Sequence, residues 1–74
     1  MPNFEPKLIG KKIRELRLMK GYKQEYMAYK VGITQTGYSK IETGETSLSL
    51  ERAGVIANAF EMSLVELIQW EIEA

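Results

Sequence analysis

Two short helical segments joined by a glycine turn constrain the fold of this chain more than any other feature. Residues 24–31 and 35–43 both have helical patterns, and only three residues separate them. Glycine tolerates a positive φ, so Gly32 allows the chain to reverse within this short connection. Thr34 is a good N-cap for the second helix. The sequence predicts two closely packed helices, whose expected apolar contacts are Ala28, Val31, Ile33, Tyr38 and Ile41.

The second of these helices begins with small polar side chains. Gln35, Thr36 and Ser39 project short hydrogen-bonding groups from its first turns. Such side chains hydrogen-bond to base edges when a helix enters the major groove of DNA. The alternative is an ordinary helical hairpin that is capped by Thr34 and leaves these side chains in solvent.

Charge is divided unevenly along the chain, although the net charge is zero. Residues 1–40 hold nine lysine and arginine residues against three glutamates, a net charge of +6. Residues 41–74 hold Arg52 against seven glutamates, a net charge of −6. This division favours orientation of the basic half toward a polyanion. The alternative is that the charges only solvate helix faces.

Composition excludes several classes of function. The 74 residues suffice for one small domain and include neither cysteine nor histidine, so we expect no disulfide, metal site or cofactor. No spacing of the remaining polar residues indicates a catalytic site, so we do not expect an enzyme. No apolar run approaches the roughly 20 residues of a membrane span, and the first residues lack a signal-peptide pattern. We therefore expect a cytoplasmic protein with no membrane partner.

Three further helices complete an all-α prediction. Apolar spacing indicates a helix over about 7–20. Ser49 can cap a fourth helix, and Ser63 with Glu66 forms a capping box for a fifth that extends toward the C-terminus. The expected inward residues of the last two helices are Leu50, Ala53, Ile56, Ala57, Phe60, Leu64, Leu67 and Ile68. No linker is visible, so residues 1–74 are predicted to form one domain.

Linked positions along these helices resemble a known family. They are Ile13, Leu16, Arg17, Gly21, Gln24-Glu25, Met27-Ala28, Val31-Gly32-Ile33-Thr34, Ser39-Lys40-Ile41-Glu42, Gly44, Ser49-Leu50-Glu51, Ala57, Ser63-Leu64 and Glu66-Leu67-Ile68. Over about residues 9–68 the chain resembles the Cro and phage-repressor-like (Xre-type) helix-turn-helix DNA-binding family. The resemblance implies a five-helix, lambda-repressor-like DNA-binding domain, with residues 69–74 as a C-terminal helix extension.

The resemblance also implies roles for particular residues. Gln24 corresponds to a glutamine that contacts a DNA phosphate, and Lys40 lies nearer the DNA backbone than the first exposed side chains of helix three. The base contacts would come from Gln35, Thr36 and Ser39. Gln35 suits adenine, because a glutamine can form a bidentate pair with its N7 and N6. For each residue the alternative is a solvated surface side chain.

Arg17 and Glu42 fall where the family often places an arginine–carboxylate pair. The resemblance therefore implies a structural ion pair between helix one and the end of helix three. We interpret both residues as scaffold and not as DNA ligands.

Three positions depart from the family pattern. Lys23 replaces the usual Ser or Thr cap of helix two, and in exchange it offers a phosphate contact. Gly37 lies inside helix three, at a cost of about 1 kcal/mol relative to alanine. Glu45 occupies a loop that is often basic in the family, and an acid there is expected to weaken DNA affinity.

The C-terminal segment has apolar residues to spare. Val65, Trp70 and Ile72 lie off the inward stripe of helix five, which suggests a dimer or partner surface. The alternative is that Trp70 folds back on helix one or the segment around Phe4. Leu18 and Met19 are further surplus apolar residues that suit either purpose.

The sequence thus favours a sequence-specific, DNA-binding transcriptional regulator. We expect a homodimer that binds a pseudo-palindromic operator in double-stranded DNA, with helix three in the major groove. The alternative from another class is a protein-interaction or antitoxin-type module on the same scaffold, which would bind a protein partner through the C-terminal helix.

Overall fold

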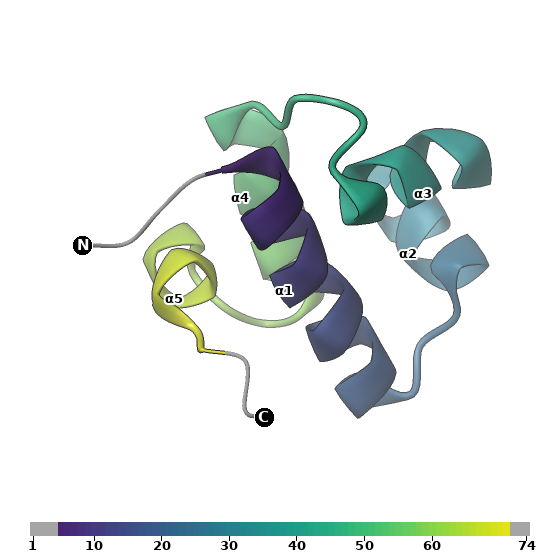
Figure 1. Ribbon diagram of the computed structural model, residues 1–74. Coiled ribbons are helices and arrows are strands. Elements are labelled where there is room, and N and C mark those ends of the chain that lie inside the picture. Colours follow the sequence, from purple (N-terminus) through teal and green to yellow (C-terminus); the bar gives the residue numbers. More distant parts are fainter. Residues whose placement is uncertain (1–4, 72–74) are drawn as a thin grey trace.

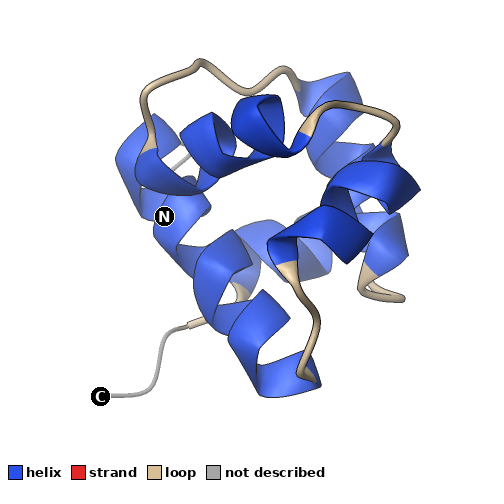
Figure 2. Cartoon of the chain, turned by 90° about the vertical axis from the view of Figure 1, so that its right-hand side faces the viewer, coloured by secondary structure: helices blue, strands red, loops and turns tan. Residues whose placement is uncertain are grey.

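The fold is a set of five short helices around one core, as seen in the computed structural model, which describes residues 5–71 (Figure 1). The helices are α1 (Pro6–Lys20), α2 (Gln24–Val31), α3 (Gln35–Thr43), α4 (Leu50–Ala59) and α5 (Leu64–Gln69). Within the described residues only helices and loops occur (Figure 2), which confirms the all-α prediction. None of these helices is long and apolar enough to cross a membrane.

Hydroxyl side chains begin the last three helices, as the sequence predicted. The Thr34 hydroxyl accepts a hydrogen bond from the Gly37 N–H at 3.0 Å, which satisfies one free donor of α3. Ser49 caps α4 in the same way. Ser63 and Glu66 form the complete capping box of α5. By contrast, α1 and α2 begin without a side-chain cap.

The turn between α2 and α3 depends on Gly32. Its φ is 82°, in the left-handed region, and its N–H donates to the Ala28 carbonyl at 2.9 Å. The Ile33 N–H donates to the same carbonyl at 3.0 Å. These bonds end α2 and start α3 within three residues, so the two helices hold a fixed relative orientation.

Apolar side chains from all five helices meet in one core, with α1 packed against α3 and α5. The largest fully buried side chains are Tyr38, Phe60, Ile9, Ile13, Met27, Ile56 and Leu67. The expectation that Leu50 faces inward was wrong, because it is 60% exposed. Leu50 is the first residue of α4, and a helical side chain leans toward the N-terminus, away from the turns that pack on the core.

The backbones of α1 and α3 approach each other closely at Gly10. A Cβ atom there would lie 2.4 Å from the Ile41 carbonyl oxygen and 2.7 Å from that of Glu42. No other residue type fits without moving α3, because both neighbours are backbone atoms. Gly10 therefore sets how closely the end of α3 sits on α1.

The expectation that helix five extends through the C-terminal residues was wrong for the part that the structure describes. α5 ends at Gln69, and Trp70 is extended, with φ −62° and ψ 134°. The Lys12 ammonium group donates to the Ile68 carbonyl at this end, which favours termination there. Trp70 is half-buried and packs against the core. Ile72 lies outside the described residues.

Candidate nucleic-acid interface

An open depression on the outer side of α3 brings together most of the predicted DNA-contacting residues. We call it the recognition surface, and it is lined by Gln24, Gln35, Thr36, Ser39, Lys40 and Glu45. Gln35, Thr36 and Lys40 are exposed, whereas Ser39 and Gln24 are half-buried. The exposed side of α3 thus presents amide, hydroxyl and ammonium groups on one surface.

A buried ion pair lies beneath this surface. Arg17 Nε donates to Glu42 Oε2 at 2.7 Å, and Arg17 Nη2 donates to Glu42 Oε1 at 3.2 Å. The side chains are only 10% and 1% exposed. Hydrogen bonding to Glu42 raises the pKa of the Arg17 guanidinium above its ordinary value, although burial opposes that shift. The pair joins α1 to α3 as a rigid support.

Gln24 connects the ion pair to the recognition surface. Its amide nitrogen donates to Glu42 Oε1 at 3.1 Å, so this amide is held by the same carboxylate as Arg17. One N–H and the carbonyl oxygen of the amide remain for other partners. A phosphate contact by Gln24 would therefore come from a side chain whose orientation α3 already fixes.

Tyr38 lies on the buried side of α3, next to the same pair. Its ring is fully buried, and its hydroxyl oxygen has no hydrogen-bond partner among the described residues. Burial raises the pKa of this hydroxyl above the ordinary tyrosine value. Tyr38 therefore places a protonated hydroxyl group within the apolar core beneath α3.

Lys23 lies apart from the recognition surface. It lines a second depression, the tyrosine surface, which consists of Gly21, Tyr22, Lys23, Glu25, Tyr26 and Tyr29. The rings of Tyr22 and Tyr26 are 4.7 Å apart, and Tyr22 also stacks on Phe60. Of the three residues expected to contact phosphates, Gln24 and Lys40 thus line the recognition surface and Lys23 lines the tyrosine surface.

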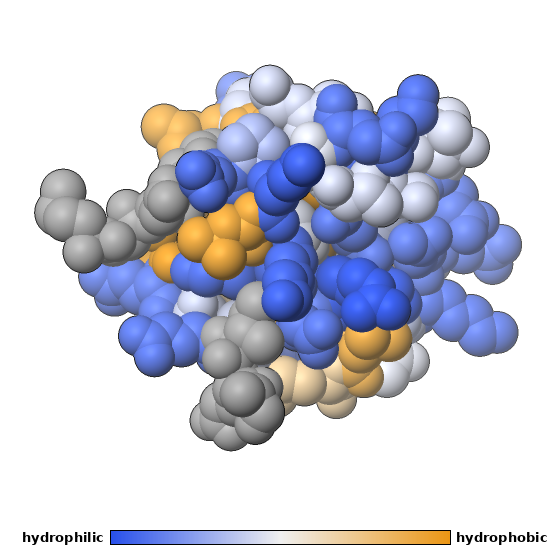
Figure 3. All heavy atoms as spheres, in the orientation of Figure 1, coloured by the Kyte–Doolittle hydropathy of each residue, from blue (hydrophilic) through white to orange (hydrophobic). Residues whose placement is uncertain are grey.

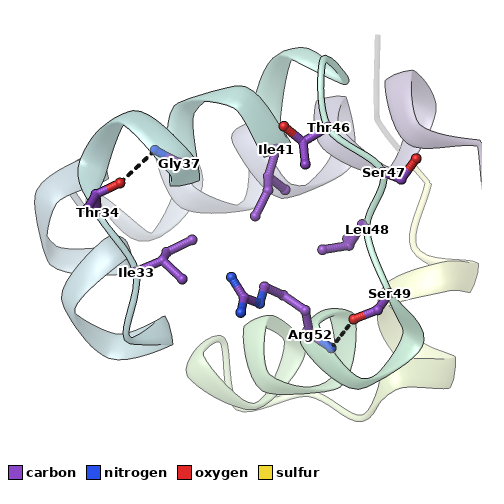
Figure 4. A pocket seen from close by; sticks show the side chains of 9 residues that line it. All are labelled: Ile33, Thr34, Gly37, Ile41, Thr46, Ser47, Leu48, Ser49 and Arg52. Carbon is purple, nitrogen blue, oxygen red and sulfur yellow. Dashed lines mark hydrogen bonds between the residues drawn. The ribbon is translucent and has the colours of Figure 1, made fainter.

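Sequence reasoning missed Arg52 as a site residue. Its guanidinium group points into a third depression, between Ile33 of the α2–α3 turn and Leu48 of the loop before α4 (Figure 4). Hydroxyl groups of that loop and the Thr34 cap line the same space. The available signal was that Arg52 is the single basic residue in the acidic half of the chain.

Glu45 was noted as a departure but not as a site residue, and it lines the recognition surface. Its N–H donates to the Lys40 carbonyl at 3.0 Å, and the Thr43 hydroxyl donates to its carboxylate at 2.7 Å. Backbone and side chain are thus both held at the end of α3. Helical spacing could not predict this placement, because Glu45 lies after the end of α3, where the helical repeat no longer applies.

Apolar surface gathers on another side of the molecule. In Figure 3 the α4 and α5 side, on the left, carries a prominent apolar area, whereas the α2 and α3 side is mostly polar. Val65 of α5 is 59% exposed. Of the three residues expected to form a partner surface, Val65 is thus exposed, Trp70 half-buried and Ile72 outside the described residues.

Comparisons with known proteins agree on one family. The sequence model of the family described as "Helix-turn-helix" matches residues 13–67. The chain is 37% identical over 62 residues to YgzD, an HTH-type transcriptional regulator of Bacillus subtilis, covering 84% of the chain and 94% of YgzD. It is 34% identical over 56 residues to YonR, a prophage-derived HTH-type regulator of the same organism, covering 76% of the chain. The matched part spans about half of YonR, 52% of its length.

A solved structure has the same fold. The restriction-modification controller protein C.AhdI from Aeromonas hydrophila superposes with a TM-score of 0.79 and 30% sequence identity, over 85% of this chain and 91% of that one. The similarity confirms the five-helix expectation for the described residues. These matches are to transcriptional regulators and a controller protein, and they confirm the prediction that the chain is not an enzyme.

Proposed function

Because this chain belongs to the helix-turn-helix family of DNA-binding regulators, we propose that it binds a specific operator with α3 in the major groove. The observation that carries this proposal is the recognition surface. Gln35, Thr36 and Ser39 face outward there, whereas Tyr38, Ile41 and Glu42 of the same helix are buried. A rigid support beneath exposed polar groups suits base contacts, because the position of α3 is already fixed before binding.

Gln35 is the proposed adenine contact. It is exposed in the first turn of α3, directly after the cap, and its amide can donate to N7 and accept from N6 of one adenine. Thr36 and Ser39 supply shorter hydroxyl contacts to neighbouring base edges. These three residues set the preferred sequence in the proposal.

Phosphate contacts position α3 on the duplex without specifying sequence. We assign them to Lys40 and Gln24 within the recognition surface. Lys23 at the tyrosine surface and Arg52 in the third depression supply further phosphate contacts beyond the recognition surface. Affinity should therefore fall as salt rises, because each neutralised phosphate releases counterions.

A homodimer is the proposed assembly. A domain of 74 residues that contacts only a few bases gains specificity by pairing two copies on a pseudo-palindrome, with half-sites about 34–36 Å apart. The exposed Val65 on the apolar α4 and α5 side supports an interface there. The polar α2 and α3 side would then stay free for DNA.

The test is selection of bound duplexes from a random DNA pool at low salt, with wild type, Gln35→Ala and a control, Lys30→Ala. Lys30 is an exposed residue of α2, outside the recognition surface and away from the proposed dimer interface on α4 and α5. We expect wild type and Lys30→Ala to enrich the same two-fold motif. Gln35→Ala should lose an adenine preference in each half-site, with an affinity loss of about 1–3 kcal/mol on the wild-type site.

Each part of the proposal has its own contrary outcome. A motif without two-fold symmetry would overturn the dimer, and an unchanged motif in Gln35→Ala would overturn the assignment of Gln35. If no motif is enriched at low salt, operator binding itself is overturned.

The second candidate function is a protein-binding module, and one observation favours it. Tyr29 is 81% exposed on the tyrosine surface, and tyrosine is enriched at protein interfaces. This surface shares none of its lining residues with the recognition surface. Absence of any enriched DNA motif would direct the search for partners to this surface.

A further inference from the structure

Glu45 is the single carboxylate among the residues that line the recognition surface. The other lining residues are amides, hydroxyls and one lysine. The negatively charged phosphates of the DNA backbone repel a carboxylate. An acid among DNA-contacting residues therefore needs a specific partner, or it only lowers affinity.

The structure holds this carboxylate in a defined position. The Glu45 N–H is bonded to the Lys40 carbonyl, which fixes the backbone at the end of α3. The Thr43 hydroxyl donates to Glu45 Oε2 at 2.7 Å, which orients the side chain. Within residues 5–71, Glu45 Oε1 receives no hydrogen bond that would use up its capacity.

Among the described residues, no lysine or arginine forms an ion pair with Glu45. The ion pairs within residues 5–71 are Arg14 with Glu15 and Arg17 with Glu42. Lys40 lines the same depression but forms no ion pair with Glu45 in the structure. The carboxylate therefore faces the proposed DNA position as an oriented acceptor, with Oε1 open to a donor among the described residues.

Only the exocyclic amines of bases can donate to such an acceptor in the major groove. They are N4 of cytosine and N6 of adenine. Adenine presents its amine beside the acceptor N7, which suits a glutamine that both donates and accepts. A carboxylate only accepts, so its match is the N4 amine of cytosine.

We propose that Glu45 accepts a hydrogen bond from the N4 amine of a cytosine in each half-site and so is a specificity-determining residue. The inference rests on the proposed operator binding and adds one base to it. Gln35 selects adenine, and Glu45 selects cytosine at another position of the same half-site. At any other base the carboxylate would lose hydration without gaining a donor, which widens the difference in affinity between right and wrong sites.

The experiment compares wild type, Glu45→Ala and Glu45→Gln in selection from the random pool. Glu71→Ala is the control, because it removes an exposed carboxylate that lies outside the recognition surface. The selected duplex is then made with 2-pyrimidinone, which is cytosine without its N4 amine, at the assigned position. Wild type and Glu71→Ala should bind this duplex about tenfold or more weakly than the cytosine duplex.

Glu45→Ala should bind both duplexes equally and should enrich no cytosine at that position. Glu45→Gln keeps an acceptor oxygen without the charge, so it should retain part of the preference. Thr43→Val removes the hydroxyl that orients the carboxylate and should give an intermediate preference for cytosine. All variants change exposed residues, and circular dichroism checks that each is folded.

The outcomes distinguish this inference from the proposed function. If wild type enriches no motif, operator binding fails and the inference fails with it. If wild type enriches a motif that Glu45→Ala also enriches unchanged, operator binding stands and the inference is overturned, because Glu45 then only repels phosphate. A wild-type motif without a fixed cytosine in the half-site also overturns it.

Discussion

The inner and outer sides of α3 differ in what holds their polar groups. On the inner side the Glu42 carboxylate is 1% exposed and accepts hydrogen bonds from Arg17 and Gln24. On the outer side Glu45 is exposed and accepts one hydrogen bond, from Thr43, among the described residues. Within one short segment, a buried polar group thus stabilises the fold, whereas an exposed one remains available to a partner.

The division has an energetic reason. A buried charge is tolerated only when partners replace its lost hydration, so Glu42 cannot give up its partners for a ligand. An exposed carboxylate keeps its hydration until binding and can exchange water for a base. Burial therefore sorts the two glutamates into different roles.

The largest expected effect on stability comes from Glu42→Ala. We expect a loss of about 3–5 kcal/mol in the free energy of unfolding, because Arg17 is left buried without its carboxylate. Urea denaturation of the purified protein measures the loss. The matched change Glu45→Ala should stay within about 0.5 kcal/mol of wild type, since Glu45 is exposed. Equal losses in the two variants would contradict the division.

The next prediction concerns alkaline pH and Tyr38. Burial raises the pKa of its hydroxyl, whereas an unfolded tyrosine titrates near pH 10. Below pH 10 the Tyr38 hydroxyl keeps its proton in both the folded and the unfolded state, so its contribution to the free energy of unfolding is fully present. Above pH 10 the unfolded state loses its proton first, so the free energy of unfolding should fall by up to about 1.4 kcal/mol per pH unit.

Urea unfolding between pH 9 and 11 tests this slope. Tyr38→Phe should remove the contribution of Tyr38, whereas Tyr29→Phe, at an exposed site, should keep it. If Tyr38→Phe retains the wild-type slope, the buried hydroxyl is not its source.

The smallest expected effect on stability comes from Lys40→Ala, on the outer side of α3. The free energy of unfolding should change by at most about 0.5 kcal/mol, because Lys40 is exposed. DNA affinity should fall by a similar factor on all sequences, and the slope of log affinity against log salt should decrease by about one. Lys30→Ala serves as the control, since Lys30 is an exposed lysine outside the recognition surface. A change in preferred sequence would show that Lys40 contacts a base instead.

Local signals predicted the helices well. Thr34, Ser49 and Ser63 mark helix starts because the capping bond forms between residues close in sequence. Gly32 marked the turn for the same reason. Helical spacing predicted the core residues of α1. It did not predict where α5 ends, because Trp70 packs against the core from an extended conformation that follows the helix.

The recognition surface was predicted in part. The exposed side of α3 follows from helical periodicity once the helix start is known, which is why Gln35, Thr36 and Ser39 were identified. The hydrogen bond between Gln24 and Glu42, 18 positions apart in sequence, depends on how α2 and α3 pack. Arg52 lies in α4, so only the folded chain brings it beside α3. Glu45 follows α3, and its place on the recognition surface depends on how the chain turns at Gly44.

The close approach at Gly10 has a consequence for how such a protein can diversify. Any side chain there would displace the end of α3 and with it the whole recognition surface. Exposed positions of the recognition surface can instead vary one at a time, without disturbing the packing of α3 on α1. A library randomised at Gln35, Thr36, Lys40 and Glu45 around an unchanged Gly10 should therefore yield folded proteins with many different operators.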